Sequence, residues 1–167
     1  MSHPSLGLPP PDRNAGQPAA AGRLRNARGR LAQIALETTV QLDSTFSDRY
    51  DELALRRFLR DYDRHIEQLA LALETGEDRF VVQYAEWLVP VMRHRHVPMR
   101  DFMLLLDGLR SAALSVLTSQ DADLLRELMA RWQARIKHHQ RLAGDHKGNS
   151  LVRFFWKGAG IADDSVV

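Results

Sequence analysis

The sequence predicts an all-α protein, an antiparallel helical bundle or globin-like domain of about five helices behind a disordered N-terminal tail. Apolar residues recur every three or four positions through most of the chain, which is the spacing of a buried helix face. No stretch of useful length alternates apolar and polar residues as a half-buried strand does. The breaks between the helical stretches are short, which favours antiparallel neighbours.

The composition divides the chain into three regions. Residues 1–22 are rich in Pro, Gly and Ala, and we expect them to be disordered because they have too little apolar surface to offset the entropy of ordering. Residues 23–144 carry the helical periodicity and form the predicted bundle. Residues 145–167 form a C-terminal segment in which aromatic and basic residues are mixed.

The strongest helical signal covers about residues 48–74. Its apolar residues follow a spacing of four, three, four, three and four, which is the a/d pattern of a heptad repeat. They are Leu55, Leu59, Tyr62, Ile66, Leu69 and Leu73. Thr75 and Gly76 end this helix, with Gly76 suited to a left-handed C-terminal cap.

The other helices are expected on either side of it. A looser apolar stripe over residues 24–42 predicts one helix before it. A third helix follows Gly76 and contains Pro90, which we expect to kink it because proline lacks a backbone donor. A fourth begins at Pro98, and a fifth covers about residues 121–143.

The net charge of +2 hides an uneven distribution. Residues 37–130 are acidic, whereas residues 1–36 and 131–157 are basic. The basic segments suit an anionic partner such as nucleic acid, an acidic protein or a membrane surface, or they neutralise the chain's own acidic bundle. The sequence shows no secretory signal and no apolar run of the roughly 18 residues that a membrane span needs, so we expect a cytoplasmic bacterial protein.

The sequence does not indicate an enzyme, and it predicts no catalytic residues, no metal and no cofactor. It has no cysteine, no nucleophile motif and no glycine-rich phosphate loop. His94 and His96 are two residues apart, and His138 and His139 are adjacent, so neither pair shares a helix face as metal ligands would. Exposed or capping histidines are the simpler interpretation.

Two groups of residues are candidates for contacts with other molecules. Aromatic residues at helical spacing belong to the core or line a pocket for a flat ligand: Tyr84, Trp87, Phe102 and Trp132, with His139 in a core-like position. Residues suited to a partner's surface lie in the two basic segments: Arg23, Arg25, Arg28 and Arg30 near the N-terminus, and Phe154, Phe155 and Trp156 within residues 151–161. The aromatic segment suits a protein partner, a second copy, a membrane surface or the bundle itself.

Residues 62–117 carry a resemblance to a known class of domain. They combine a heptad helix ending in Thr-Gly, a Tyr-x-x-Trp-Leu helix, a His-Val-Pro turn and a leucine-rich helix. This arrangement resembles the helical regulatory domains that precede cobalamin-binding or other signalling domains in bacterial regulators, and it is similar to globin-like sensor domains of stressosome proteins. The chain has no Asp-x-His-x-x-Gly motif and no α/β cobalamin-binding domain, so cobalamin binding is not implied.

What the resemblance implies is a non-enzymatic regulatory or protein-interaction module that binds a protein partner or forms a homodimer. Two alternatives remain open. One is a sensor domain that binds a small ligand or tetrapyrrole in the aromatic pocket. The other is a nucleic-acid-associated factor that uses the basic N- and C-terminal segments.

Overall fold

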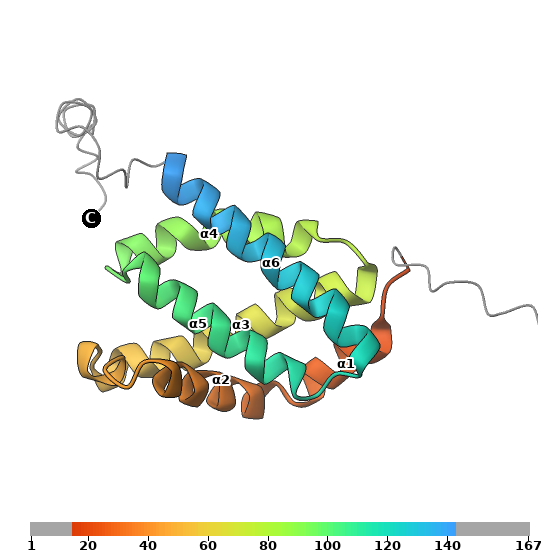
Figure 1. The fold of residues 1–167 in the computed structure, drawn as a ribbon, viewed down its shortest axis with the longest axis horizontal. Helices are drawn as coiled ribbons and strands as arrows, with labels where there is room; N and C mark the ends of the chain where they lie inside the picture. Colours follow the sequence, from red (N-terminus) through yellow and green to blue (C-terminus); the bar gives the residue numbers. More distant parts are fainter. Residues whose placement is uncertain (1–14, 143–167) are drawn as a thin grey trace, which may run out of the picture.

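The computed structural model describes residues 15–142, and these residues form an all-α domain, as predicted (Figure 1). Its six α-helices are α1 (Pro18–Asn26), α2 (Arg28–Leu42), α3 (Glu52–Thr75), α4 (Arg79–His94), α5 (Met99–Leu114) and α6 (Ser119–Leu142). A single 3-10 turn, η1 (Ser47–Arg49), lies between α2 and α3. Within residues 15–142, no helix is long and apolar enough to cross a bilayer.

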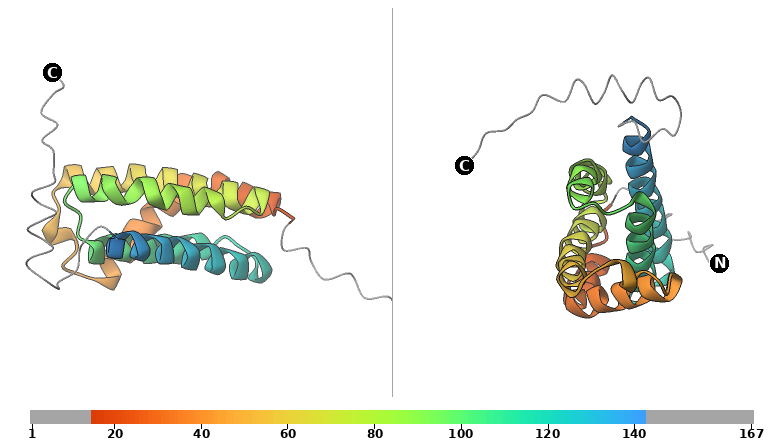
Figure 2. Two further views of the ribbon diagram at one scale, coloured as in Figure 1. Left: turned by 90° about the horizontal axis from the view of Figure 1, so that it is seen from above. Right: turned by 90° about the vertical axis from the view of Figure 1, so that its left-hand side faces the viewer.

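The helices form two layers (Figure 2). One layer holds α1, α3 and α4, and the other holds α5 and α6. The layers meet where α4 packs against α6, and α2 lies across the opposite edge, where it contacts both α3 and α5. The core fills the space between the layers, with Tyr62, Ile66, Leu106 and Trp132 among its fully buried side chains.

Helix α3 confirms the heptad prediction over most of its length. Asp51 caps its N-terminus by accepting a hydrogen bond from the amide of Ala54 at 2.7 Å, and Gly76 ends it with φ 72°. From Tyr62 to Leu73 the heptad positions are buried. Leu59, however, is only half-buried, and so is Leu55 one turn before it. The first two of the six heptad residues are therefore only partly packed into the core.

The helical domain begins earlier than residue 23, so our expectation of disorder through residue 22 is wrong for residues 18–22. Helix α1 starts at Pro18, and both Ala20 and Ala21 are buried. The amide of Gln17 donates a hydrogen bond of 2.5 Å to the carbonyl of Leu73 in α3. Small alanine side chains let α1 approach α3 closely, so the tail-like composition was misleading here. Residues 1–14 and 143–167 lie outside the described residues.

Helix α4 continues through Pro90 as one element, and Pro90 itself is exposed. Its ring faces solvent, where the missing amide hydrogen bond costs least. The helix ends in a Schellman motif: the amide of Val97 donates to the carbonyl of Met92 at 3.0 Å, and that of His96 donates to Arg93 at 2.9 Å. His96 occupies the left-handed position with φ 56°, which glycine usually fills.

Candidate protein-binding groove between α2 and α3

An open groove of about 690 Å³ lies on the surface between α2 and α3. Its floor is apolar and consists of Leu36 and Val40 from α2 and Leu59 from α3, all half-buried. Its rim is polar and consists of the exposed side chains Gln33, Glu37 and Gln41. Five of these residues come from α2. Counted from Gln33, the other four lie three, four, seven and eight residues further along, so all five lie on one face of that helix.

Helix α2 has apolar residues on two faces, and this is why the groove exists. One face, which includes Leu31, Ala35 and Thr39, is fully buried. Gly108 of α5 lies against the Thr39 side chain and the Ala35 carbonyl, so α2 and α5 are in close contact. The second face meets α3 near its start, where the heptad stripe is half-buried at Leu59. Residues on that face are therefore left partly open to solvent.

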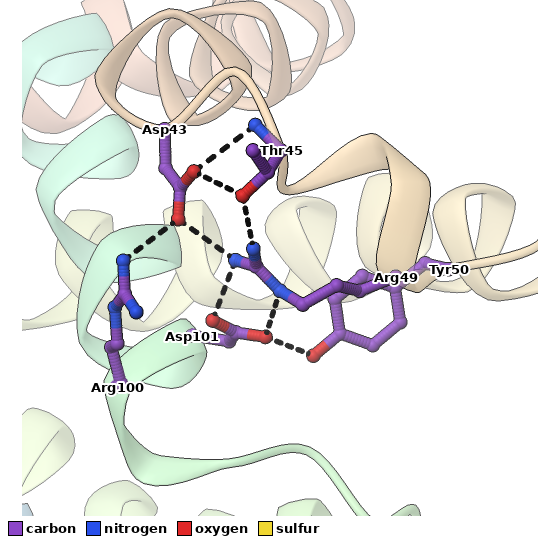
Figure 3. Close-up of polar contacts among 6 residues, drawn as sticks. All are labelled: Asp43, Thr45, Arg49, Tyr50, Arg100 and Asp101. Atoms are coloured by element: carbon purple, nitrogen blue, oxygen red, sulfur yellow. Dashed lines mark hydrogen bonds and ion pairs between the residues drawn. The ribbon is translucent and has the colours of Figure 1, made fainter.

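A polar clasp holds the connection between α2 and α3, and Figure 3 shows its six residues: Asp43, Thr45, Arg49, Tyr50, Arg100 and Asp101. Asp43, directly after α2, accepts hydrogen bonds from the Thr45 hydroxyl at 2.7 Å, from Arg49 at 3.0 Å and from Arg100 at 3.1 Å. Asp101, in the first turn of α5, accepts two bonds from Arg49 and one of 2.7 Å from the Tyr50 hydroxyl. The clasp therefore joins the end of α2 and the start of α5 to one arginine.

Two donors in the clasp lower the pKa of Asp43. Hydrogen bonds from Thr45 and then from Arg49 lower the pKa of Asp43 to about 2. Burial, and then the hydrogen bond to Asp101, raise the pKa of Tyr50 above its usual range. Two carboxylates face two guanidinium groups, so the clasp is electrically balanced and its acids are occupied by donors. These bonds fix the connection between α2 and α3 relative to the start of α5.

Phe46 anchors the same connection on its apolar side. Its ring is fully buried, 4.9 Å from the Tyr50 ring and 5.9 Å from the Phe58 ring of α3, measured between centroids. Two leucines beside the connection remain exposed: Leu42, the last residue of α2, at 55%, and Leu53, in the first turn of α3, at 53%. Apolar surface is therefore concentrated at this end of the molecule, next to the groove.

Three of the predicted pocket aromatics come together, but as a packed cluster. The rings of Tyr84 and Trp132 lie 5.6 Å apart, and each lies 5.6 Å from the ring of His65. Trp87 stacks on Tyr84 at 5.5 Å and is 49% exposed. These separations mean direct ring contact, so a flat ligand would have to displace the rings.

The other two pocket candidates lie outside this cluster. Phe102 is buried in α5 and has no ring contact with these three aromatics. His139 lies beside Glu86, with its Nε2 atom 3.9 Å from the carboxylate. The residue that sequence analysis missed is His65, whose Nδ1 is 2.9 Å from the Tyr84 hydroxyl.

Three of the basic residues near the N-terminus form ion pairs with acidic residues of the same chain. Arg23 pairs with Asp121 at the start of α6. Arg25 pairs with Glu67 and Glu74 of α3, and Arg28 pairs with Asp63 and Glu67 at 3.5 and 3.8 Å. Arg30 is exposed. Three of the four arginines therefore already neutralise the chain's own acidic residues, which leaves less charge for phosphate. Phe154, Phe155 and Trp156 lie outside the described residues.

Within residues 15–142, no three His, Asp or Glu side chains are grouped as metal ligands. Comparison with known proteins adds no relative to these observations. No family model, no curated protein and no solved structure matches this chain.

Proposed function

We propose that this chain is a protein-interaction module that receives an amphipathic helix of a partner protein in the groove between α2 and α3. The single observation that carries the proposal is the groove's construction, an apolar floor inside a polar rim. Helix-in-groove recognition uses this arrangement, because the partner's apolar residues enter the floor and its polar residues meet the rim.

The dimensions of the groove support this mode of binding. Its α2 wall spans the eight residue steps from Gln33 to Gln41, which is roughly 12 Å at 1.5 Å per residue. That length accepts about two turns of a helix, with apolar side chains at positions i, i+3 and i+4. The clasp keeps the connection beside the groove rigid, so little ordering entropy is lost on binding.

The chemistry of the rim defines the kind of partner. Among the residues of 15–142 that line the groove, Glu37 alone is charged, and it is exposed. A partner helix with basic residues beside its apolar stripe therefore suits this surface better than an acidic one. We propose a regulatory role for such binding, since the fold carries no assembled catalytic group among the residues described above.

Site-specific photo-crosslinking in the source cells tests this proposal. A photoreactive amino acid replaces Val40 in the groove, and the matched control replaces Gln83, an exposed residue of α4. Both are made in the full chain. We expect an adduct at position 40 but not at position 83, with the crosslink mapped to a basic amphipathic helix.

The affinity of the purified partner for variants of the groove is then measured. Leu36→Asp should reduce its affinity at least about tenfold, because a carboxylate would enter the apolar floor. Gln83→Asp should leave the affinity unchanged. If position 40 gives no specific adduct, or if the adducts map to sequences without an apolar helical stripe, the proposal is wrong.

A further inference from the structure

We infer that the outer face of α3 and α4 binds single-stranded nucleic acid, with three arginines of α3 against its phosphates and Trp87 of α4 against an unpaired base. None of these residues lines the groove between α2 and α3, so the inference goes beyond the proposed function and does not rest on it. Three observations carry it: arginines without a carboxylate partner, an exposed indole stacked on a fixed ring, and the proximity of the two.

Arg57, Arg60 and Arg64 form a basic stripe along the exposed side of α3. All three are exposed, and their spacing of three and four residues places them within one sector of about 60° of the helix. The stripe spans seven residue steps, which is roughly 10 Å at 1.5 Å per residue. Helix α3 lies in one layer with α1 and α4, and its side away from α5 and α6 is open (Figure 2). The stripe is therefore a row of cations on an uncovered helix face.

The basic stripe is not neutralised by its own helix. Four-residue spacing would pair Arg57 with Asp61, but Asp61 is buried and pairs with Arg95, after α4, at 2.5 Å. The next two carboxylates of α3 are likewise paired with arginines of α2 and α1: Asp63 with Arg28 and Glu67 with Arg25. Within residues 15–142, no carboxylate lies within ion-pair distance of an arginine in the stripe. The charge of the stripe is therefore available to an anion.

Trp87 provides a flat apolar surface next to the stripe. It is 49% exposed, and its indole stacks on the Tyr84 ring, with centroids 5.5 Å apart and planes 23° apart. Tyr84 is held in turn by His65 of α3, whose Nδ1 is 2.9 Å from the phenol oxygen. A base that stacks on the open part of the indole meets a surface that is already ordered, so little side-chain entropy is lost.

Arg64 connects the stripe to the indole. It directly precedes His65 in α3, and its guanidinium is close enough to act on Tyr84. Burial, and then the charge of Asp61, raise the pKa of Tyr84, and Arg64 acts against them. Arg64 and Trp87 therefore lie beside the same tyrosine.

The exposed side of α4 adds no negative charge to this surface. Its exposed residues include Gln83, Pro90 and His94. Glu86, the one carboxylate of α4, pairs with Arg135 of α6. A phosphate chain that follows the stripe toward Trp87 therefore meets no unpaired carboxylate of α4.

The combination of cations and a stacking ring identifies the ligand. Single-stranded nucleic acid offers a phosphate chain and bases with free faces, and proteins bind it with basic residues and aromatic platforms. An acidic peptide needs only the cations, and a duplex keeps its bases stacked on one another. A membrane surface needs a broad apolar face, whereas Gln83 and His94 share the exposed side of α4 with Trp87.

Fluorescence anisotropy of labelled oligothymidylate and oligouridylate, each of about 12 nucleotides, measures binding to the full chain. We expect dissociation constants of about 1 to 100 μM at physiological salt. Each phosphate contact of a single strand contributes about 0.7 to the slope of log affinity against log salt, so three arginines predict a slope of about −2. A duplex of the same length should bind at least about threefold more weakly, because its bases are not free to stack. The tighter of the two oligonucleotides identifies the sugar of the ligand.

Two triple variants separate the stripe from the overall charge. The first carries Arg57→Gln, Arg60→Gln and Arg64→Gln. The matched control carries Arg30→Gln, Arg110→Gln and Arg126→Gln, which remove the same charge from α2, α5 and α6. We expect the first to lower the affinity at least about tenfold and to bring the salt slope close to zero, whereas the control should change the affinity less than about threefold.

Trp87→Leu tests the stacking platform. It should lower the affinity at least about fivefold without changing the salt slope, because it removes a ring but no charge. Trp87→Phe should restore part of the affinity. In the unaltered protein, photo-crosslinking with oligonucleotides that contain iodouridine should give an adduct at Trp87, mapped by mass spectrometry. Circular dichroism confirms that each variant is folded.

Four results would overturn the inference. They are equal losses in the two triple variants, a folded Trp87→Leu protein with unchanged affinity, adducts confined to other residues, and a duplex that binds as tightly as the single strands. Competition with polyglutamate and with phosphatidylserine vesicles completes the test. If either displaces the oligonucleotide at a lower concentration than unlabelled oligonucleotide does, the surface belongs to an acidic protein or a membrane instead. None of these results bears on the groove, whose test uses Val40 and Leu36.

Discussion

Arg49, between α2 and α3, donates two hydrogen bonds to the carboxylate of Asp101 in the first turn of α5, at 3.1 and 2.8 Å. The residues are 52 positions apart in the sequence. Asp101 is buried, and Tyr50 is its third donor. Because a buried acceptor that loses its donors has no water to replace them, this pair fixes the course of the chain beside the groove.

Asp101→Asn should therefore destabilise the fold by about 1 to 3 kcal/mol. The amide keeps the size of the side chain, but it removes the charge and turns an N–H₂ group toward one of the donors. Urea unfolding followed by circular dichroism measures the effect. Glu52→Gln is the control, because Glu52 pairs with Arg56 at an exposed site and should change stability by less than about 1 kcal/mol. Equal effects of the two changes would mean that the clasp is not structural.

Gly108 provides a test of the contact between α2 and α5. A methyl group at this position would overlap the Thr39 hydroxyl and the Ala35 carbonyl, and the latter belongs to a helix backbone that cannot easily move. Gly108→Ala should destabilise the protein by about 1 to 3 kcal/mol, although alanine favours helices more than glycine does.

Gly22 in α1 is the matched control, because a methyl group there would meet no atom within 4 Å. Gly22→Ala should stabilise the protein by up to about 1 kcal/mol through helix propensity alone. Thermal unfolding of both variants decides the matter. A stabilised Gly108→Ala protein would contradict the close approach of α2 and α5.

Much of this fold could be predicted because its signals are local. The heptad spacing from Tyr62 to Leu73 and the stop at Gly76 both belong to one helix, so they depend only on residues close together in the sequence. The groove was not predicted, because Leu36 and Val40 become a floor only when Leu59, from another helix, lies beside them. The clasp likewise depends on Asp101, which resembles an ordinary acidic residue in a first helical turn.

Helix α1 shows the same limit at the other end of the chain. Ala20 and Ala21 have little apolar surface each, and the proline before them is equally common in tails. They are buried because α1 packs against α3, where the amide of Gln17 also hydrogen-bonds to the carbonyl of Leu73. The contact between α1 and α3 joins distant parts of the sequence, and no local sequence pattern predicts it.

Substitutions in α1 test whether this helix is docked. Ala21 is fully buried, so Ala21→Glu should cost more than about 3 kcal/mol by placing a carboxylate in an apolar site. Ala19 is exposed two residues earlier, and Ala19→Glu should change stability by no more than about 0.5 kcal/mol. Chemical unfolding of both variants measures the contrast. If Ala21→Glu leaves the stability unchanged, α1 is not packed against α3, and residues 18–22 belong to the N-terminal tail.

His96 marks a strained position in the turn between α4 and α5. A side chain with φ 56° at the end of a helix costs roughly 1 kcal/mol relative to glycine, which adopts this conformation freely. His96→Gly should therefore raise stability by about 0.5 to 1 kcal/mol. Thermal unfolding measures the gain, and His94→Gly, inside the same helix, should instead lower stability.

The pH dependence of stability should come in part from His65. Burial, and then the nearby guanidinium groups of Arg95 and Arg64, lower the pKa of this imidazole to about 3. In the unfolded chain the pKa returns to about 6.5. Between these two values the unfolded state binds a proton that the folded state does not. Acidification through this window therefore favours unfolding, and stability is fully present only above about pH 6.5.

The slope of this loss approaches about 1.4 kcal/mol per pH unit for one group. His65→Gln removes the titrating group, and its amide can still form a hydrogen bond with the Tyr84 hydroxyl. Other acids contribute equally to both proteins. We therefore expect the stability of the variant to change less steeply than that of the wild type as the pH falls from about 6.5 toward 4.

Urea unfolding at a series of pH values tests this expectation, with His94→Gln as the control at an exposed position. The control profile should run parallel to that of the wild type, whereas the His65→Gln profile should converge on it at low pH. Parallel profiles for all three proteins would mean that His65 takes up a proton in the folded state. The imidazole would then be accessible to water, and the contact of Tyr84 and Trp132 over it would have to open.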